Sequence, residues 1–487
     1  MSRQYDGPIV DIARYVFHYE ITDEAAWRFA RLALMDSIGC AIETLTKSEE
    51  CRRMLGPIEP IGPSGFRLPG TNYVLDPIRG AFNMGMLIRY LDHSDALAGA
   101  EWGHPSVLDN IGAILAVADW LCISSNNNFS ARRLGPPLTV KTLLTAIIKA
   151  YEIQGCYQMR NAFNEHGLDH VILVKLASTA VVSWLLGLTE EQTMAAISHV
   201  WMDGHPSRVY RSGANTIPRK GWAGGDACMR AVHLALLTKA GQVGAPTVLS
   251  DAKWGFQARC FGGKEFDLPR PFRTWAIQNI AFKVMPVEGH GISSVEAALI
   301  QRERLLRKGL QVSDISKIEV RTTKAADMII NKSGPLHNAA DRDHCVQYAI
   351  ALVLLKGSYP ETQDYNDDSP WATSTELATL RDKIVVWPDA QLTEDYLNIE
   401  KRSVSAGLTF HLQDGGVLDE VLSEYPPSHV RNPRTETLAR EKFVRNMQLK
   451  FSDAEIERVV RNVHNDELSI KDLVGLLTRE DSVITKL

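Results

Sequence analysis

Apolar residues in the first half of the chain recur at the spacing of an α-helix. One face of the helix expected after Thr22, which can cap it, carries Trp27, Ala30, Leu34 and Ile38. The segment 144–151 repeats this spacing, and Thr189 to Gln192 form a capping box for a helix that Gly204 can close. Because strands do not alternate with helices here, the pattern argues against a doubly wound sheet.

The pattern changes after about residue 275, where apolar and polar residues begin to alternate. QDGG at 413–416 predicts a hairpin turn into a further strand, VLDEVL. Two polar stretches, SSNNNFS at 124–130 and the surroundings of YNDDSP at 365–370, are typical of surface loops. The alternation predicts half-buried strands at KIEVRTT (317–323), KIVVW (383–387) and LTFHL (408–412).

Helix signals return near the end of the chain, where Ser452 and Ser469 begin two capping-box patterns. A chain of 487 residues is also too long for one compact core. We therefore predict a mainly α protein. A large all-helical domain, residues 1–275 and 426–487, is interrupted by a smaller α+β domain at residues 276–425.

The composition is that of an ordinary globular protein, with 45% apolar and 23% charged residues. The net charge is −5, so no global positive field attracts nucleic acid. An anionic ligand would need a local cluster of basic residues.

The chain shows no sign of a membrane segment or a secretory signal. No apolar run reaches the roughly 18–20 residues of a membrane span, and residues 1–17 include Asp6 and Asp11, which suit neither a signal nor a transit peptide. The seven cysteines are scattered without a CxxC pair, which is typical of free thiols in a reducing compartment. We expect an intracellular protein. Three compartments are open: the cytoplasm, the peroxisome, and the mitochondrial matrix if a transit peptide has been removed. The peroxisome is included because the last three residues (485–487) loosely resemble the S-K-L signal.

Ionisable residues gather in four stretches, at 91–106, 164–175, 204–227 and 282–298. The first directly follows an apolar run, and the third is rich in glycine. In chain order, the four stretches contribute Asp92, Asp95, Glu101 and His104; His166, Asp169 and His170; Arg208, Arg211, Arg219 and Lys220; and Lys283, Glu288 and His290.

Each of these groups has a plain structural explanation when it is taken singly: a buried histidine, a helix-capping aspartate or a solvated run of charge. Taken together, they favour a site. Glycine and proline beside two of the histidines let the backbone approach a ligand closely. Four cations within thirteen residues can grip a small molecule with several negative charges. Histidines supply acid and base near neutral pH, so the set favours proton chemistry beside a carboxylate.

Metal and nucleotide motifs are missing from the sequence. There is no HExxH and no cluster of cysteine and histidine. DHSD at 92–95 imitates an aspartate-rich motif for magnesium and diphosphate, but a second such motif is not evident. GxGxxG and GxxxxGK[ST] are also missing. We therefore expect neither a metal site nor a nucleotide cofactor.

Long strings of this sequence match the MmgE/PrpD family, which the chain resembles nearly end to end. The resemblance implies a large helical domain with a smaller α+β lid domain, a homodimer, and catalysis without a cofactor. Known reactions are dehydration of 2-methylcitrate, decarboxylation of cis-aconitate and epimerisation, all through a carbanion-like centre beside a carboxylate. The matching strings are RYLDHSDALAGAEWGHPS, IKAYEIQGC, GLDHVILVKLASTAVV, NTIPRKGWAGGDA, EGHGISSVEAA and GPLHNAADRDHCVQY.

The resemblance also implies where the active site lies. The three histidines are candidates for base and acid, without an assignment among them, while the aspartate would orient a histidine or share in proton transfer. The lysine would hold a substrate carboxylate. The catalytic positions match Asp92 in LDHSD, His104 in GHPS, His170 in LDH, Lys220 in PRK and His290 in EGHG. Further substrate-binding candidates are Arg89, Asp95, Arg208, Arg211 and Arg219.

The chain departs from the family pattern at one point. Dehydratases of the family read GHPSDN where this chain reads GHPSVLDN, so Val107 and Leu108 form a two-residue insertion after His104. A loop could absorb the insertion, or the insertion could reshape the pocket. Fungal relatives dehydrate longer alkylcitrates in maleidride biosynthesis, which is a secondary metabolism. The insertion and the lack of a visible presequence would fit such a role.

We therefore expect a dehydratase acting on 2-methylcitrate, as in propionate metabolism, or on a longer 2-alkylcitrate, to give the cis-2-alkylaconitate. A base would remove a proton beside a carboxylate, and nearby cations would stabilise the charge that develops there. Two alternatives stay open: a decarboxylase acting on cis-aconitate, and an inactive paralogue that binds a metabolite or partner. The expected ligand is a small tricarboxylate, with neither nucleic acid nor membrane as a partner.

Overall fold

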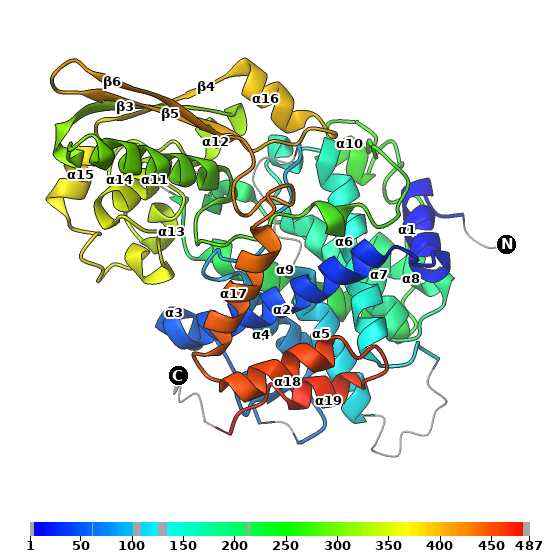
Figure 1. Cartoon of the computed structure of the whole chain (residues 1–487). Helices are drawn as coiled ribbons and strands as arrows, with labels where there is room; N and C mark the ends of the chain where they lie inside the picture. Colours follow the sequence, from blue (N-terminus) through cyan, green and yellow to red (C-terminus); the bar gives the residue numbers. More distant parts are fainter. Residues whose placement is uncertain (1–3, 61, 101–108, 125–133, 212–214, 481–487) are drawn as a thin grey trace.

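The computed structural model describes residues 4–60, 62–100, 109–124, 134–211 and 215–480. Helices form most of it, and a four-stranded sheet stands at one end of the molecule (Figure 1). The prediction of a mainly α protein, with a large helical part and a smaller α+β part, is confirmed.

Buried apolar side chains form two main cores, one for each part. The larger core draws on residues from Tyr5 to Phe282 and again from Ala439 to Leu477. The smaller core runs from Val284 to Val421. The chain therefore leaves the helical domain and returns to it, and the α+β domain lies between. The borders at residues 275 and 425 stay a prediction, although the two cores change over close to them.

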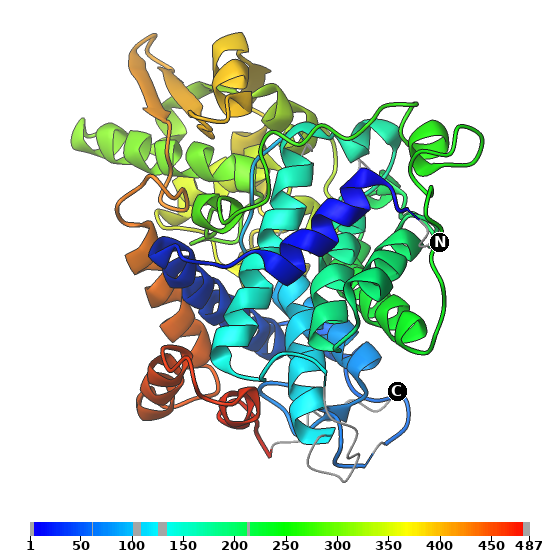
Figure 2. The ribbon, with the colours of Figure 1, turned by 90° about the vertical axis from the view of Figure 1, so that its right-hand side faces the viewer.

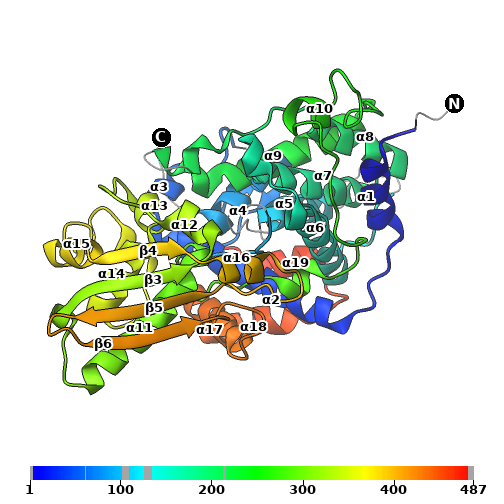
Figure 3. The ribbon, with the colours of Figure 1, turned by 90° about the horizontal axis from the view of Figure 1, so that it is seen from above.

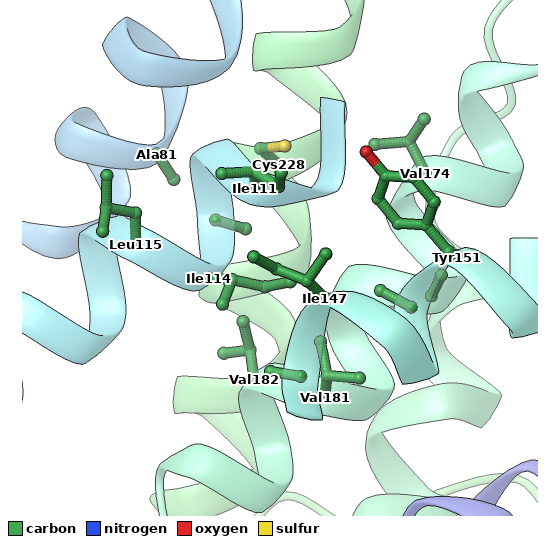
Figure 4. Packing of buried hydrophobic residues seen from close by; sticks show 14 of the residues in the cluster. Ala81, Ile111, Ile114, Leu115, Ile147, Tyr151, Val174, Val181, Val182 and Cys228 are labelled. Carbon is green, nitrogen blue, oxygen red and sulfur yellow. The ribbon is translucent and has the colours of Figure 1, made fainter. Parts of the chain in front are cut away.

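Five long helices form the centre of the helical domain: α4 (Pro77–Arg89), α5 (Asp109–Ser124), α6 (Val140–Arg160), α7 (Val171–Leu185) and α9 (Arg219–Lys239). Figure 4 shows Ile111 and Ile114 of α5 packed among Ile147 of α6 and Val181 and Val182 of α7. This interlocking of aliphatic side chains holds the centre of the domain rigidly.

Two glycine contacts bring α4, α5 and α9 unusually close. A Cβ added to Gly112 would lie 2.6 Å from the Cα of Gly85, and one added to Gly85 would lie 2.9 Å from the Cα of Gly225. Because no side chain separates these backbones, the C-terminal end of α4 lies beside the N-terminal end of α9. This juxtaposition positions the candidate site.

Shorter or peripheral elements complete the helical domain. The last three helices return from the α+β domain, and α17 packs along α2 (Figure 2). The peripheral elements are α1 (Gly7–His18), α2 (Glu24–Lys47), α3 (Glu49–Arg52), the hairpin β1 (Phe66–Arg67) and β2 (Val74–Leu75), η1 (Phe163–His166), α8 (Glu190–Val200), η2 (Arg208–Arg211), α10 (Phe256–Cys260), η4 (Ala276–Asn279), α17 (Thr435–Met447), α18 (Asp453–Val463) and α19 (Ile470–Gly475).

The α+β domain is a four-stranded sheet with helices packed on one face, as seen from above in Figure 3. The strand order is β4 (Ile384–Pro388), β3 (Ile315–Thr322), β5 (Ala406–Leu412) and β6 (Val417–Ser423). Strands β3 and β4 are parallel and the other pairs are antiparallel. The remaining elements are η5 (Gly289–Gly291), α11 (Ile292–Arg307), η6 (Val312–Asp314), α12 (Lys324–Ile330), α13 (Ala339–Arg342), α14 (Val346–Lys356), η7 (Thr362–Tyr365), α15 (Thr375–Arg381) and α16 (Ala390–Leu397).

Most local predictions agree with the structure. The predicted strands coincide with β3, β4, β5 and β6, and QDGG forms the turn between the last two. Thr189 and Ser452 make the predicted capping boxes, while Ser469 caps α19 by accepting from the backbone N–H of Asp472.

Three local predictions are wrong. The cap of α2 is Asp23 rather than Thr22, because the Asp23 carboxylate accepts the N–H of Ala25 at 2.9 Å. Helix α8 ends at Val200, so Gly204 lies beyond it rather than closing it. Tyr365, at the start of the predicted surface loop YNDDSP, is buried. Most of the other predicted loop, SSNNNFS, lies outside the described residues.

None of the described helices combines the length and the apolarity that crossing a membrane would require.

Candidate active site

Asp92 lies just after the C-terminal end of α4, where the chain turns toward the α+β domain. Its φ of 53° is left-handed, which costs free energy for a residue with a side chain. Arg89 pairs with its Oδ1. Lys283 Nζ lies 3.0 Å from its Oδ2 and 3.1 Å from its carbonyl oxygen. The strained turn therefore holds one carboxylate between two cations from distant parts of the chain.

Lys220 comes from the first turn of α9, which lies against the residue that follows α4. A Cβ added to Gly221 would be 3.1 Å from the Cα of Tyr90. Lys220 Nζ lies 2.8 and 2.9 Å from the two carboxylate oxygens of Asp343, and 3.1 Å from Nδ1 of His344. Asp343 and His344 belong to the α+β domain, between α13 and α14. The contact therefore bridges the two domains.

His344 connects the two carboxylates. Its Nδ1 is 2.6 Å from Asp343 Oδ1 and 3.9 Å from Asp92 Oδ2. Since Nδ1 carries either a proton or a lone pair, it donates to Asp343 in one tautomer and accepts from Lys220 in the other. The set is called the interdomain cluster below, and it consists of Arg89, Asp92, Lys220, Lys283, Asp343 and His344.

Burial and charge act in opposite directions on the interdomain cluster. Burial raises the pKa of Asp92, but Arg89, Lys283 and Lys220 outweigh it and hold that pKa well below its usual value. Lys220 similarly outweighs burial at Asp343, so the pKa of Asp343 is lowered. Burial lowers the pKa of His344, which favours a neutral ring. Three cations thus face two ionised carboxylates, and the excess positive charge suits an anionic ligand.

The same cluster is a poor site for a metal ion. Ligand atoms of Asp92, Asp343 and His344 lie within 4.8 Å of one another, as a metal site requires. However, both carboxylates already contact an ammonium or guanidinium group. A divalent cation would have to enter beside these positive charges, which repel it.

A second group of charges surrounds His170 at the start of α7. Asp169 Oδ2 lies 2.6 Å from Nε of Arg211 and 3.9 Å from Nη1 of Arg208. Burial, together with the two arginines, holds the pKa of His170 well below its usual value despite the neighbouring Asp169. Its Nε2 is buried without a hydrogen-bond partner among the described residues. His170 has a neutral ring, and its Nε2 can accept a proton only in the tautomer that carries the ring proton on Nδ1, which lies 3.7 Å from Asp169 Oδ1 and 3.5 Å from Arg208 Nη1.

His290 lies at the junction of the two domains, in η5. Its Nδ1 is 3.0 Å from Glu288 Oε2, and its Nε2 is 3.2 Å from the hydroxyl of Tyr396. Tyr396 in turn donates to the carbonyl of Gly99 at 3.2 Å. The N–H of Glu288 donates to the carbonyl of Asp343 at 3.2 Å, which ties the His290 segment to the interdomain cluster.

Two of the predicted substrate-binding residues lie apart from these groups. The guanidinium of Arg219 stacks over Trp222, 4.2 Å from the ring centroid, and over Tyr210 at 5.3 Å. Asp95 is buried near Tyr151, whose pKa is raised well above its usual value, first by burial and then by the Asp95 charge. The geometry therefore supports ligand contacts for Arg89, Arg208 and Arg211 more directly than for these two.

His104 and the inserted Val107 and Leu108 lie outside the described residues. Sequence reasoning gave no role to Asp343 and His344, although the family string GPLHNAADRDHCVQY contains both. Lys283 and Asp169 were in the candidate stretches but also had no role.

Lys442 of α17 holds the backbone of two residues beside the Asp92 side chain: His93, which follows it, and Lys283, which pairs with it. Its Nζ donates to the carbonyls of His93 at 2.9 Å and Lys283 at 2.7 Å, and lies 2.6 Å from Asp36 Oδ1. The side chain of Lys442 is only 1% exposed. A helix from the end of the chain thereby fixes the spacing between Asp92 and Lys283.

A cavity of about 620 Å³ opens beside the interdomain cluster, between the two domains. Lys220 and Asp343 form part of its wall, together with Tyr90 and Tyr365. Further cations on the wall come from Lys47 and from the segment 52–53. Its volume falls within the roughly 300–1,000 Å³ that is typical of small-molecule sites.

Two family models match this chain. The model described as the MmgE/PrpD N-terminal domain matches residues 10–269, and the MmgE/PrpD C-terminal domain matches residues 285–466. The second match begins where the smaller hydrophobic core begins and continues past it into α17 and α18.

Similar curated proteins carry dehydratase names. An alkylcitrate dehydratase phiI from Fungal sp. (strain ATCC 74256) is 61% identical, over 99% of this chain and 95% of its own. A protein of the same name from Talaromyces stipitatus is 53% identical, over 99% of each chain. A 2-methylcitrate dehydratase from Salmonella typhimurium is 44% identical, over 94% of this chain and 93% of its own.

Proposed function

Because this chain belongs to the MmgE/PrpD family, we propose that it is a dehydratase, a carbon–oxygen lyase that converts a 2-alkylcitrate into the cis-2-alkylaconitate. The observation that carries the proposal is the similarity, over nearly the full length, to enzymes named alkylcitrate and 2-methylcitrate dehydratase. The buried charges between the two domains give this similarity a chemical basis.

The substrate carries three carboxylates, and the interdomain cluster has one more cation than carboxylate. Lys220, Lys283 and Arg89 would therefore bind substrate carboxylates beside Asp92 and Asp343. Arg208 and Arg211 outnumber Asp169 in the group around His170, so they can bind a further carboxylate. Charge-assisted hydrogen bonds of this kind are roughly twice as strong as neutral ones.

We assign His170 as the base, in the tautomer that has the ring proton on Nδ1 beside Asp169 and the lone pair on Nε2. It removes the proton beside a substrate carboxylate, and negative charge spreads onto that carboxylate. Lys220 and Lys283 stabilise this charge, which is greatest in the transition state. Preorganised donors are effective here because they are already in place before the proton leaves.

The departing hydroxyl leaves as water after it receives a proton. His290 is the acid in this account, since Glu288 lies 3.0 Å from its Nδ1 and orients the ring. As the hydroxyl leaves, the electron pair of the broken C–H bond forms the new double bond. His104 stays a predicted member of the site, and Asp92 orients Lys283 and Arg89.

A longer alkyl chain is favoured over methyl. The relatives named alkylcitrate dehydratase are 61% and 53% identical to this chain, whereas the 2-methylcitrate dehydratase from Salmonella typhimurium is 44% identical. The proposal accordingly places the enzyme in maleidride biosynthesis rather than propionate metabolism, acting without a cofactor and as a homodimer.

The proposal is tested by turnover of 2-methylcitrate and 2-hexylcitrate in the presence of EDTA. Product formation is followed by the ultraviolet absorbance of the conjugated acid and checked by mass spectrometry. We expect both to be dehydrated, with the higher kcat/KM for 2-hexylcitrate. Conversion of neither substrate would refute dehydration, and release of carbon dioxide from cis-aconitate would assign the site to decarboxylation instead.

A further inference from the structure

Tyr365 is a buried residue among neighbours in the sequence that are mostly polar. It closes η7, and only 3% of it is exposed. Arg342 Nε donates to its carbonyl at 2.6 Å, and its ring lies 5.9 Å from the ring of Tyr348. The first contact fixes the backbone of Tyr365 and the second contacts its ring, so its position is a property of the folded α+β domain.

The hydroxyl of Tyr365 has no hydrogen-bond partner among the described residues. Leaving a buried hydroxyl unpaired costs roughly 1–3 kcal/mol, so such groups call for an explanation. Tyr365 also lines the cavity that contains Lys220 and Asp343. An unpaired donor in the wall of a cavity is satisfied when a ligand oxygen enters.

Its surroundings distinguish Tyr365 from the other tyrosine of this cavity. Burial, and after it the charge of Glu50, raises the pKa of Tyr90, and no member of the interdomain cluster is among the causes. The carboxylates that act on Tyr365 are Asp343, then Asp364, with a smaller effect from Asp92. Tyr365 therefore lines the same cavity as Asp343 and lies in the field of the two carboxylates that hold Lys220 and Lys283.

Burial and these carboxylates raise the pKa of Tyr365 well above its usual value. The phenol accordingly keeps its proton at any working pH. A phenolate formed during turnover would lie in the field of three carboxylates, so proton transfer from Tyr365 is disfavoured. The group is suited to donate a hydrogen bond and to keep its proton.

We propose that Tyr365 is a further substrate-contacting residue, whose hydroxyl donates a hydrogen bond to a carboxylate of the tricarboxylate bound at Lys220. This rests on the proposed dehydratase function. The contact comes from the α+β domain, whereas Lys220 belongs to the helical domain, so one substrate carboxylate is held from both sides of the interdomain cavity.

The test compares Tyr365→Phe with Tyr157→Phe. Tyr157 is a matched control, because it is also buried with an unpaired hydroxyl, but it lies in the helical core, away from the cavity. Each substitution removes an unpaired hydroxyl without creating another unpaired group, so both variants should unfold at or above the temperature of the wild type. A drop in melting temperature for Tyr365→Phe alone would show that the hydroxyl has a structural role and would overturn the proposal.

Two measurements separate the outcomes. With 2-hexylcitrate, Tyr365→Phe should lower kcat/KM roughly 10- to 100-fold, mainly through KM, while Tyr157→Phe leaves it unchanged. With tricarballylate, a tricarboxylate that lacks the hydroxyl, isothermal titration should show a similar loss of affinity. Unchanged affinity for tricarballylate overturns the proposal, whatever happens to turnover. Absence of wild-type turnover refutes only the dehydratase function, because tricarballylate binding still tests the contact.

Discussion

Lys220 of the helical domain and Asp343 of the α+β domain form a buried ion pair, with Nζ 2.8 and 2.9 Å from the two carboxylate oxygens. The residues are 123 positions apart in the sequence. Because each domain supplies one partner, the interdomain cluster exists only while the domains are docked. Substrate carboxylates would enter this same contact, so binding and domain docking are physically coupled.

Replacing the Asp92 carboxylate by an amide should lower both activity and stability, so rates are compared at a temperature where the variant is shown to be folded. Asp92→Asn keeps the shape of the side chain but removes the charge that holds Lys283 and Arg89. We expect kcat for 2-alkylcitrate dehydration to fall roughly 10²- to 10⁴-fold. Glu303→Gln is the control, since Glu303 is exposed and pairs with Arg307 on the surface of α11. Equal rates for the two variants would exclude Asp92 from the chemistry.

The acidic limb of the pH profile should lie below the usual range of histidine. Since the pKa of His170 is held well below its usual value, the base stays unprotonated as the pH falls through about 6.5. We expect kcat/KM to stay level there and to decline only at lower pH, with short assays that precede acid unfolding. A midpoint at 6.5 or above would remove His170 from the role of base. His170→Gln should abolish the pH dependence together with most of the activity.

His429 should make the fold sensitive to acid. Its Nε2 donates to the carbonyl of Arg402 at 3.0 Å, and its Nδ1 accepts the N–H of Arg431 at 3.1 Å. Burial, followed by the positive charges of Arg402 and Arg431, lowers the pKa of His429 to about 4. The unfolded chain takes up a proton on this ring from about pH 6.5 downward, whereas the folded chain does not, so stability is lost as the pH falls from 6.5 to 4.

The loss at pH 4 relative to pH 7 should be roughly 3 kcal/mol for this group, at about 1.4 kcal/mol for each unit of pKa. Urea unfolding at a series of pH values measures it. His429→Gln should flatten the curve between pH 4 and 6.5, and an identical slope in wild type and variant would count against this explanation.

Loss of Lys442 should weaken both the fold and the site. Lys442→Met leaves the Asp36 carboxylate buried without its cation, which costs roughly 3–5 kcal/mol of unfolding free energy. It also frees the carbonyls of His93 and Lys283, so Asp92 and Lys283 lose their fixed spacing. Asp36→Asn with Lys442→Met removes both charges and should recover much of the stability. If the double variant also recovers full kcat, Lys442 does not position the site.

The sequence predicted the repeating parts of the fold well. Alternation at 317–323 and 408–412 identified β3 and β5, because one face of each strand is buried and the other is not. The cap of α2 was displaced by one residue, since Thr22 and Asp23 are both good caps and only the backbone geometry selects between them.

The candidate site was predictable only in part. Asp92 and Lys220 could be named from motifs, but their partners Asp343 and His344 meet them through the packing of two domains, which no local pattern records. Tyr365 shows the same limit. Its polar neighbours are typical of a loop, yet Arg342 holds its backbone carbonyl, and its buried ring lies beside that of Tyr348.

The central claim is that the interdomain cluster carries out the elimination, and Lys220→Met tests it most directly. Lys239→Met is the matched control on the same helix, since Lys239 lies at the far end of α9 and donates to the carbonyl of Leu186. Initial rates of cis-2-alkylaconitate formation are compared at a temperature where both variants are shown to be folded. The account predicts a fall in kcat of at least roughly 100-fold for Lys220→Met and wild-type kcat for Lys239→Met. Wild-type kcat in folded Lys220→Met would contradict it.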